Sequence, residues 1–158
     1  MNKKIIAIGL ALSFGGLSCI TAQAKGISST TEAEKLASDY VKGATVLHVE
    51  EDDDDGVWVY EVDMKKGSKK YELKYNASNG KLVEYQWEKI SHKKASKKVS
   101  EKTIRRMAEK KVKNATITEL DYDSDDAKYE IEMYDKSKKY ELEYSTDGTL
   151  ISYKWEKL

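Results

Sequence analysis

Proline is absent from this 158-residue chain, and cysteine occurs once, as Cys19. Cys19 lies in the apolar stretch near the start, so a form cleaved after Ala24 contains no thiol. Disulfides, thiolate metal sites and cysteine nucleophiles are then excluded together. No HExxH motif, nucleophile elbow or glycine-rich phosphate loop occurs, and His48 and His92 lack the pattern of a zinc site. We therefore expect neither an enzyme nor a bound cofactor.

The first 24 residues have the three parts of a secretory signal peptide. MNKK is basic, IIAIGLALSFGGL is apolar but short for a membrane span, and AQA places small residues before Lys25. Cys19 in GLSC suggests an alternative, a lipid anchor, but glycine stands where a lipobox has leucine. We expect cleavage after Ala24 and export to the medium, the periplasm or the cell envelope.

The charge balance argues against a nucleic-acid partner. Removal of residues 1–24 takes away Lys3 and Lys4 and leaves 26 basic and 28 acidic side chains, a net charge of −2. Residues 91–99 are locally basic, with four lysines and no carboxylate. An exported, net acidic chain is a poor match for phosphate-backbone recognition, so we interpret 91–99 as a linker and expect no nucleic-acid binding.

Two stretches about seventy residues apart have nearly the same sequence. KYELKYNASNGKLVEYQWEKI (70–90) matches KYELEYSTDGTLISYKWEKL (139–158), and YEVDMKKGSKKYEL (60–73) matches YEIEMYDKSKKYEL (129–142). The similarity extends upstream as a pattern, so the chain reads as two copies of one unit.

Each copy begins with an apolar stripe at helical spacing. The stripe consists of Ala33, Leu36, Ala37, Tyr40 and Val41 in the first copy and of Ile104, Met107, Ala108 and Val112 in the second. Ser29 or Thr31 is expected to cap the first helix and Ser100 the second. Gly43 and Asn114 follow the helices, where a left-handed residue ends a helix.

After each helix the apolar period changes to two, which is typical of antiparallel strands with one solvated face. In the first copy Trp58, Tyr60, Val62 and Met64 alternate with polar residues, and the strand before them, around 46–50, is ambiguous. Glycines in NASNG and STDG fit hairpin turns. The acidic runs EEDDDDG (50–56) and DYDSDD (121–126) are expected to form the first hairpin tip of each copy.

These patterns predict an α+β fold of two repeats, each one N-terminal helix packed on a four-stranded antiparallel β-meander. The predicted organisation is a signal peptide (1–24), repeat 1 (25–90), a basic linker (91–99) and repeat 2 (100–158). A unit of this size is marginal alone, so we expect the two to fold cooperatively.

The repeat unit resembles the PepSY domain, a small bacterial module that is secreted or membrane-associated. The last hairpin carries the resemblance through Tyr71–Tyr75, Asn79-Gly80 and Leu82-Val83, while the family's frequent aspartate at the strand end is Asn76 or Ser145 here. The architecture is also similar to that of beta-lactamase inhibitory proteins, which bind across their sheets. The resemblance implies a tandem PepSY protein that modulates or inhibits secreted peptidases, and it brings no catalytic residues.

The acidic runs also allow a different function, capture of calcium, which prefers six to eight oxygen ligands. Neither run fits an EF-hand loop, and a solvated hairpin tip whose charges discourage edge association is the preferred interpretation. The candidate ligands are Asp53, Asp55, Asp121, Asp123 and Asp125.

Aromatic residues provide the remaining candidates. Trp87 and Trp155 occupy equivalent strand ends and could either join the two copies or contact a partner. We thus carry two hypotheses: a non-enzymatic PepSY-type module that binds a protein partner such as a secreted peptidase, and a cell-envelope protein that binds calcium.

Overall fold

The computed structural model describes residues 25–91 and 97–158. The predicted signal peptide, including Cys19, and residues 92–96 of the predicted linker lie outside the described residues. No helix in the described part of the chain is both long enough and apolar enough to span a membrane.

Within the described residues, each half of the chain consists of one helix followed by four strands. The first half contains α1 (Thr30–Tyr40), β1 (Thr45–Asp54), β2 (Val57–Lys66), β3 (Lys69–Asn76) and β4 (Leu82–Lys89). The second half contains α2 (Glu101–Lys111), β5 (Thr116–Asp123), β6 (Lys128–Tyr134), β7 (Lys138–Ser145) and β8 (Leu150–Lys157). The fold is therefore a mixed α/β arrangement with the element types expected from the two periodicities.

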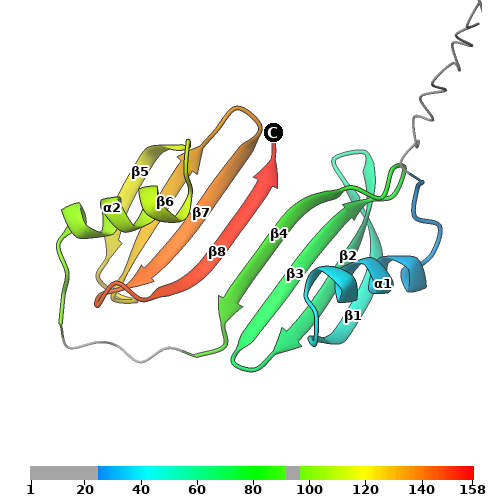
Figure 1. Ribbon diagram of the computed structural model, residues 1–158, viewed down its shortest axis with the longest axis horizontal. Helices are drawn as coiled ribbons and strands as arrows, with labels where there is room; N and C mark the ends of the chain where they lie inside the picture. Colours follow the sequence, from blue (N-terminus) through cyan, green and yellow to red (C-terminus); the bar gives the residue numbers. More distant parts are fainter. Residues whose placement is uncertain (1–24, 92–96) are drawn as a thin grey trace, which may run out of the picture.

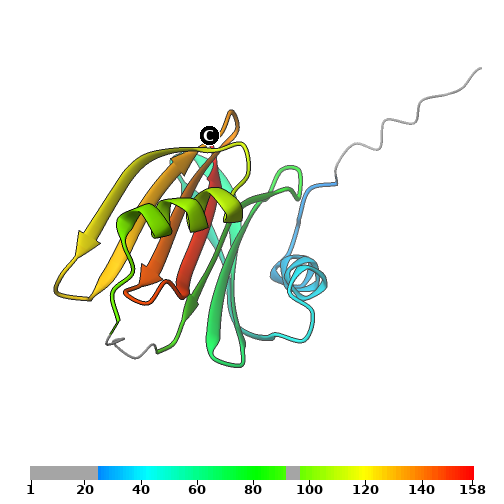
Figure 2. The same ribbon diagram turned by 60° about the vertical axis from the view of Figure 1, so that its left-hand side comes forward.

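All eight strands form one antiparallel sheet in the order β1-β2-β3-β4-β8-β7-β6-β5. The two helices lie on the same face of this sheet, α1 over the strands of the first half and α2 over those of the second (Figure 1; Figure 2). The opposite face carries no helix in the described part of the chain, and we call it the open face.

Strands β4 and β8 join the two halves. Tyr85 pairs with Trp155, Gln86 with Lys154, and Trp87 with Tyr153. Gln86 and Lys154 occupy matching places in the two similar sequences, so the junction is centred on equivalent residues. The outermost strands of the joined sheet are β1 and β5.

Both helices begin and end as their sequences predict. The Ser29 hydroxyl oxygen accepts from the Glu32 amide at 3.3 Å, and the Ser100 hydroxyl accepts from the Thr103 amide at 3.3 Å. Gly43 and Asn114 have φ of 76° and 67°, the left-handed conformation that ends a helix. The predicted cap at Ser29 is confirmed, and the competing start at Thr31 is wrong.

Two hydrophobic clusters lie between the helices and the sheet. One forms under α1 around Ala33, Ala37, Val62, Met64 and Leu73. The other forms under α2 around Ile104, Ala108, Ile131, Met133 and Leu142. Tyr85 packs against both clusters from the central strand β4, so the junction also links the two cores.

Three details differ from the sequence predictions. Strand β1 continues through the acidic run to Asp54, because the turn consists only of Asp55 and Gly56, whose φ values of 52° and 85° suit a two-residue hairpin. Trp58 is 57% exposed and Val59 is buried instead, which reverses the predicted alternation at the start of β2. On α1, Leu36 and Tyr40 are exposed, so Ala33, Ala37 and Val41 form the buried stripe.

Candidate functional site

The open face of the sheet is lined with charged side chains because the polar positions of every strand point there. The alternation that buries apolar residues under the helices necessarily directs the intervening residues to the other side. In β6 and β7, buried Ile131, Met133 and Leu142 alternate with half-buried or exposed Glu130, Glu132, Glu141 and Glu143. The sequence pattern therefore positions the charges through the same register that builds the core.

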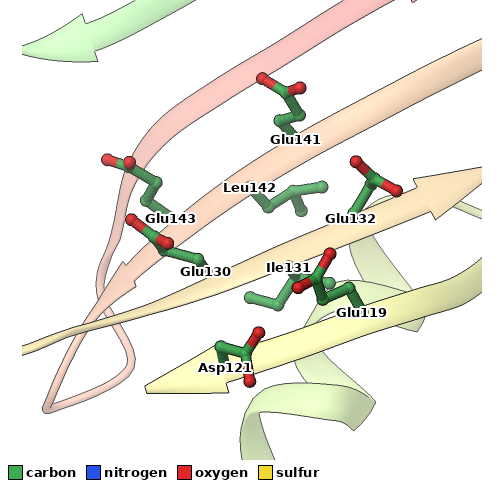
Figure 3. Close-up of a pocket in the computed structure, with 8 residues that line it drawn as sticks. All are labelled: Glu119, Asp121, Glu130, Ile131, Glu132, Glu141, Leu142 and Glu143. Carbon is green, nitrogen blue, oxygen red and sulfur yellow. The ribbon is translucent and has the colours of Figure 1, made fainter. Parts of the chain in front are cut away.

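Six carboxylates gather on this face over β5, β6 and β7 (Figure 3). We call them the acidic patch: Glu119, Asp121, Glu130, Glu132, Glu141 and Glu143. They line a shallow depression whose empty volume, including open solvent, is about 640 Å³.

The acidic patch places like charges directly opposite one another, which destabilises a sheet. Asp121 pairs with Glu130, and Glu130 with Glu143. In the neighbouring row Glu119 pairs with Glu132, and Glu132 with Glu141. Carboxylates thus stand opposite carboxylates in two rows across three strands.

Two lysines form ion pairs with four of the six carboxylates. Lys128 Nζ lies 2.9 Å from Glu130 and 2.8 Å from Glu143. Lys139 Nζ lies 3.0 Å from Glu132 and 2.7 Å from Glu141, and its hydrogen bond lowers the pKa of Glu132. Six carboxylates and two lysines leave a formal surplus of four negative charges.

Glu119 and Asp121 form the part of the patch that no lysine bridges among the described residues. Hydrogen bonding to Asp121, followed by the charge of Asp121, raises the pKa of Glu119. A cationic group placed between them would complete the pattern that Lys128 and Lys139 establish beside them. The arrangement is suited to binding ammonium or guanidinium groups.

The first half of the open face has a related but less acidic arrangement. Carboxylate oxygens of Glu61, Asp63 and Glu72 lie within 4.8 Å of one another. Burial, followed by the charge of Glu61, raises the pKa of Glu72. Lys74 lies 3.3 Å from Glu61 and 3.9 Å from Glu72. In β7 the position that matches Lys74 is Glu143, which explains the greater negative charge of the second half.

The five candidate calcium ligands are not brought together. Asp53 lies on β1 and Asp121 on β5, at the two outer edges of the sheet. Asp53 accepts a hydrogen bond from the Gly56 amide at 2.6 Å, and Asp123 accepts from the amide of Asp125 at 2.8 Å. These carboxylates hold their own turns, and Asp55 is one of the two turn residues.

Trp87 and Trp155 are 8% and 7% exposed, on the helix side of the junction. Lys69 Nζ lies 3.2 Å from the ring centroid of Trp87, and Lys138 Nζ lies 3.4 Å from that of Trp155. The rings thus have little free surface, and their pairing with Tyr153 and Tyr85 places them at the junction.

Sequence reasoning did not single out the acidic patch. It treated the polar half of each strand as ordinary solvated surface and looked for carboxylates in the hairpins. The available signal was a pair of alternate glutamates in each of two consecutive strands, Glu130 and Glu132 followed by Glu141 and Glu143.

Comparisons with known proteins support the resemblance for the first half. Residues 28–86 match the PepSY family, described as Peptidase propeptide and YPEB domain. The match covers α1 and β1 to β3 and reaches into β4. The search of curated proteins gave no match.

Two solved structures were found by comparison with this chain. The YpeB C-terminal domain of Bacillus megaterium superposes with a TM-score of 0.51 at 13% identity, over 82% of this chain and 63% of its own. A candidate lipoprotein from Clostridium difficile 630 gives a TM-score of 0.40 at 20% identity, over 84% of this chain and 95% of its own. The similarity to the YpeB C-terminal domain concerns the fold alone.

Proposed function

We propose that this protein is an exported, non-enzymatic PepSY-type module that binds a protein partner on its open face and modulates or inhibits a secreted peptidase. The family match of residues 28–86 carries the proposal, because the family is described as a peptidase propeptide domain. The open face supplies the surface, since no helix covers it in the described part of the chain (Figure 2).

The proposal includes a second PepSY-like copy at 100–158, after a linker at 91–99, and a signal peptide at 1–24. The second copy is supported by the recurrence of one helix and four strands in the same order. It is supported also by the β4–β8 junction, whose centre lies at matched residues of the two sequences. The signal peptide rests on the basic, apolar and small-residue segments before Lys25.

The mechanism would be occlusion of the partner, with no bond made or broken. A lysine or arginine of the partner would enter between Glu119 and Asp121, where no lysine of the described residues is placed. Electrostatic complementarity of this kind accelerates association and selects the partner, and it weakens with salt. The expected partner surface is therefore basic.

Affinity capture from the culture fluid and envelope of the producing organism tests the binding role. We expect the wild-type protein to retain a peptidase, and hydrogen exchange of the complex to slow at β5–β7. The double variant Glu119→Gln/Asp121→Asn should retain much less of this peptidase. The control Glu34→Gln/Asp39→Asn removes the same charge from exposed sites on α1 and should behave like wild type. Slower exchange confined to the helices would show that the partner docks on the helix side of the sheet, and it would contradict docking on the open face.

Calcium binding is the second candidate function, and the Glu61–Asp63–Glu72 group favours it. Oxygens within 4.8 Å of one another match the ligand spacing around an ion coordinated at roughly 2.4 Å. Lys74 already contacts two of these residues, so calcium would have to displace it.

Calorimetric titration with calcium distinguishes the possible sites. Heat that disappears in Glu72→Gln would assign binding to the open face. Heat that disappears when Asp53, Asp55, Asp123 and Asp125 are replaced by asparagine would assign it to the hairpins. Absence of heat, with an unchanged melting temperature, would exclude this second function.

A further inference from the structure

The solvent-facing side of α2 carries a row of cations, which we call the α2 basic stripe. It consists of Lys102, Arg105, Arg106, Lys110 and Lys113, the last just beyond the helix end. Spacings of three and four residues place them on one side of the helix, away from buried Ile104 and Ala108. All five side chains belong to exposed residues.

None of the five cations has an ion pair or a hydrogen bond from its side chain within residues 25–91 and 97–158. This differs from the open face, where Lys74, Lys128, Lys139 and Lys154 each contact two carboxylates within 4.0 Å. Glu101 and Glu109 each lie four residues from Arg105, so the stripe and these two neighbours carry a formal excess of three positive charges, which remains available to an external anion.

Packing does not require these charges, as a comparison with α1 shows. Both helices have 11 residues and bury two small or aliphatic side chains in the same pattern. The sequence of α1, TTEAEKLASDY, has one lysine and three carboxylates, whereas that of α2, EKTIRRMAEKK, has five cations and two carboxylates. Interaction with the helix dipole accounts only for lysines in the last turn, so it does not explain Lys102, Arg105 or Arg106.

We propose that the α2 basic stripe binds a linear phosphate polymer. Guanidinium groups bind phosphate oxygens in a bidentate manner, and Arg105 and Arg106 supply two of them side by side. From Lys102 to Lys110 the stripe extends over about 12 Å along the helix axis, which lets consecutive phosphates of an extended chain contact successive cations. The low net charge of the whole chain conceals this local excess.

A flat anionic membrane fits this surface less well than a linear polymer. Both helices lie on the same face of the sheet, so a flat surface approaching α2 also approaches the carboxylates of α1 (Figure 1). The stripe contains no apolar residue that could enter a bilayer, unlike a membrane-surface helix. A polymer chain can follow α2 without contacting α1.

This inference does not depend on the proposed peptidase partner, because the two surfaces lie on opposite faces of the sheet. A polymer bound to α2 would leave the acidic patch free. Failure of one proposal therefore leaves the other unaffected.

Titration of residues 25–158 with long-chain inorganic polyphosphate tests the inference. We expect the logarithm of the association constant to fall linearly with the logarithm of the salt concentration. The variant Arg106→Gln/Lys110→Gln should bind roughly tenfold or more weakly at low salt, with a salt slope smaller by about two. The control Lys35→Gln/Lys42→Gln removes two exposed cations at α1 and should bind like wild type. Circular dichroism confirms that each variant is folded.

Two further probes distinguish the alternatives. Polyglutamate of similar length should bind at least tenfold more weakly than polyphosphate, since carboxylates replace the phosphates. Vesicles of phosphatidylglycerol should not retain the protein at the same salt concentration. The proposal is overturned if polyphosphate does not bind, if the α2 variant binds it like wild type, if polyglutamate binds equally well, or if the vesicles are the better ligand.

Discussion

Tyr75 and Tyr129 are both buried, and their hydroxyl groups differ in whether they form a hydrogen bond. The Tyr129 hydroxyl donates a hydrogen bond to the carbonyl oxygen of Val99 at 2.6 Å. The Tyr75 hydroxyl is fully buried and has no hydrogen-bond partner among the described residues. A buried polar group without a partner costs stability, whereas a satisfied one contributes modestly.

Phenylalanine substitutions at these two positions should therefore have opposite effects. Tyr75→Phe removes an unsatisfied hydroxyl and should raise the free energy of unfolding by about 1 kcal/mol. Tyr129→Phe removes a hydrogen bond and leaves the Val99 carbonyl unpaired, and should lower it by about 1 kcal/mol. Urea denaturation measures both, and a loss of stability in Tyr75→Phe would show that the hydroxyl has a partner in solution.

The raised pKa of Glu119 in the acidic patch makes the stability of the fold depend on pH. Its hydrogen bond with Asp121 and the charge of Asp121 raise its pKa in the folded state above the usual 4.5. A carboxyl group with a raised folded pKa contributes stability that is fully present below pH 4.5 and is lost as the pH rises through the folded value. The ionised group therefore destabilises the fold at pH 7.

The substitution Glu119→Gln should raise the melting temperature at pH 7 and leave it nearly unchanged below pH 4, where Glu119 is protonated. Thermal unfolding followed by circular dichroism at the two pH values provides the measurement. Glu34→Gln on α1 is the matched control, since it removes an exposed charge outside the patch. A lower melting temperature for Glu119→Gln at pH 7 would contradict the repulsion described for these carboxylates.

At the scale of helices and strands, much of the fold follows from the sequence. Apolar spacing of three and four residues predicts both helices, and alternation predicts the strands after them. Gly43 and Asn114 adopt the left-handed conformation expected after a helix. The extension of β1 to Asp54 was not predictable from composition, because aspartate is rare in strands and its placement depends on the two-residue turn at Asp55-Gly56.

The pairing of β4 with β8 could not be predicted from the sequence. Each strand resembles an ordinary edge strand, and nothing in its pattern specifies a partner in the other half. The same limit applies to the acidic patch, because it depends on the register that aligns Asp121 with Glu130 and Glu130 with Glu143. Local patterns specify elements, whereas register between distant strands depends on the packed molecule.

Separation of the two halves tests the role of the β4–β8 junction. A fragment of residues 25–91 loses β8 and exposes the β4 edge together with Tyr85, which packs against both cores. We expect this fragment to unfold at a lower temperature than the whole chain and to dimerise by pairing β4 with β4 about Gln86. Sedimentation equilibrium measures the association.

A matched fragment of residues 97–158 should behave in the same way through β8 about Lys154. Replacement of Gln86 by proline in the first fragment should abolish its dimer, since proline removes a ladder hydrogen bond. A monomeric 25–91 fragment that is as stable as the intact protein would show that the halves fold independently.

At the scale of the whole molecule, charge is divided between the two faces of the sheet in the second half. The acidic patch lies on the open face, and the α2 basic stripe lies on the helix side. The nearly balanced composition conceals this division, because it averages charges that the fold separates. The two surfaces therefore present opposite charges to any partner that approaches.

Titration of a secreted peptidase preparation from the producing organism tests the proposed function most directly. Residues 25–158 should change the peptidase activity in a dose-dependent manner, and the effect should weaken as salt is raised. The variant Glu119→Gln/Asp121→Asn should require a much higher concentration to change the peptidase activity by the same amount, whereas Glu34→Gln/Asp39→Asn should match wild type. Peptidase activity that does not respond to the wild-type protein, or that responds equally to the patch variant, would contradict docking through the open face.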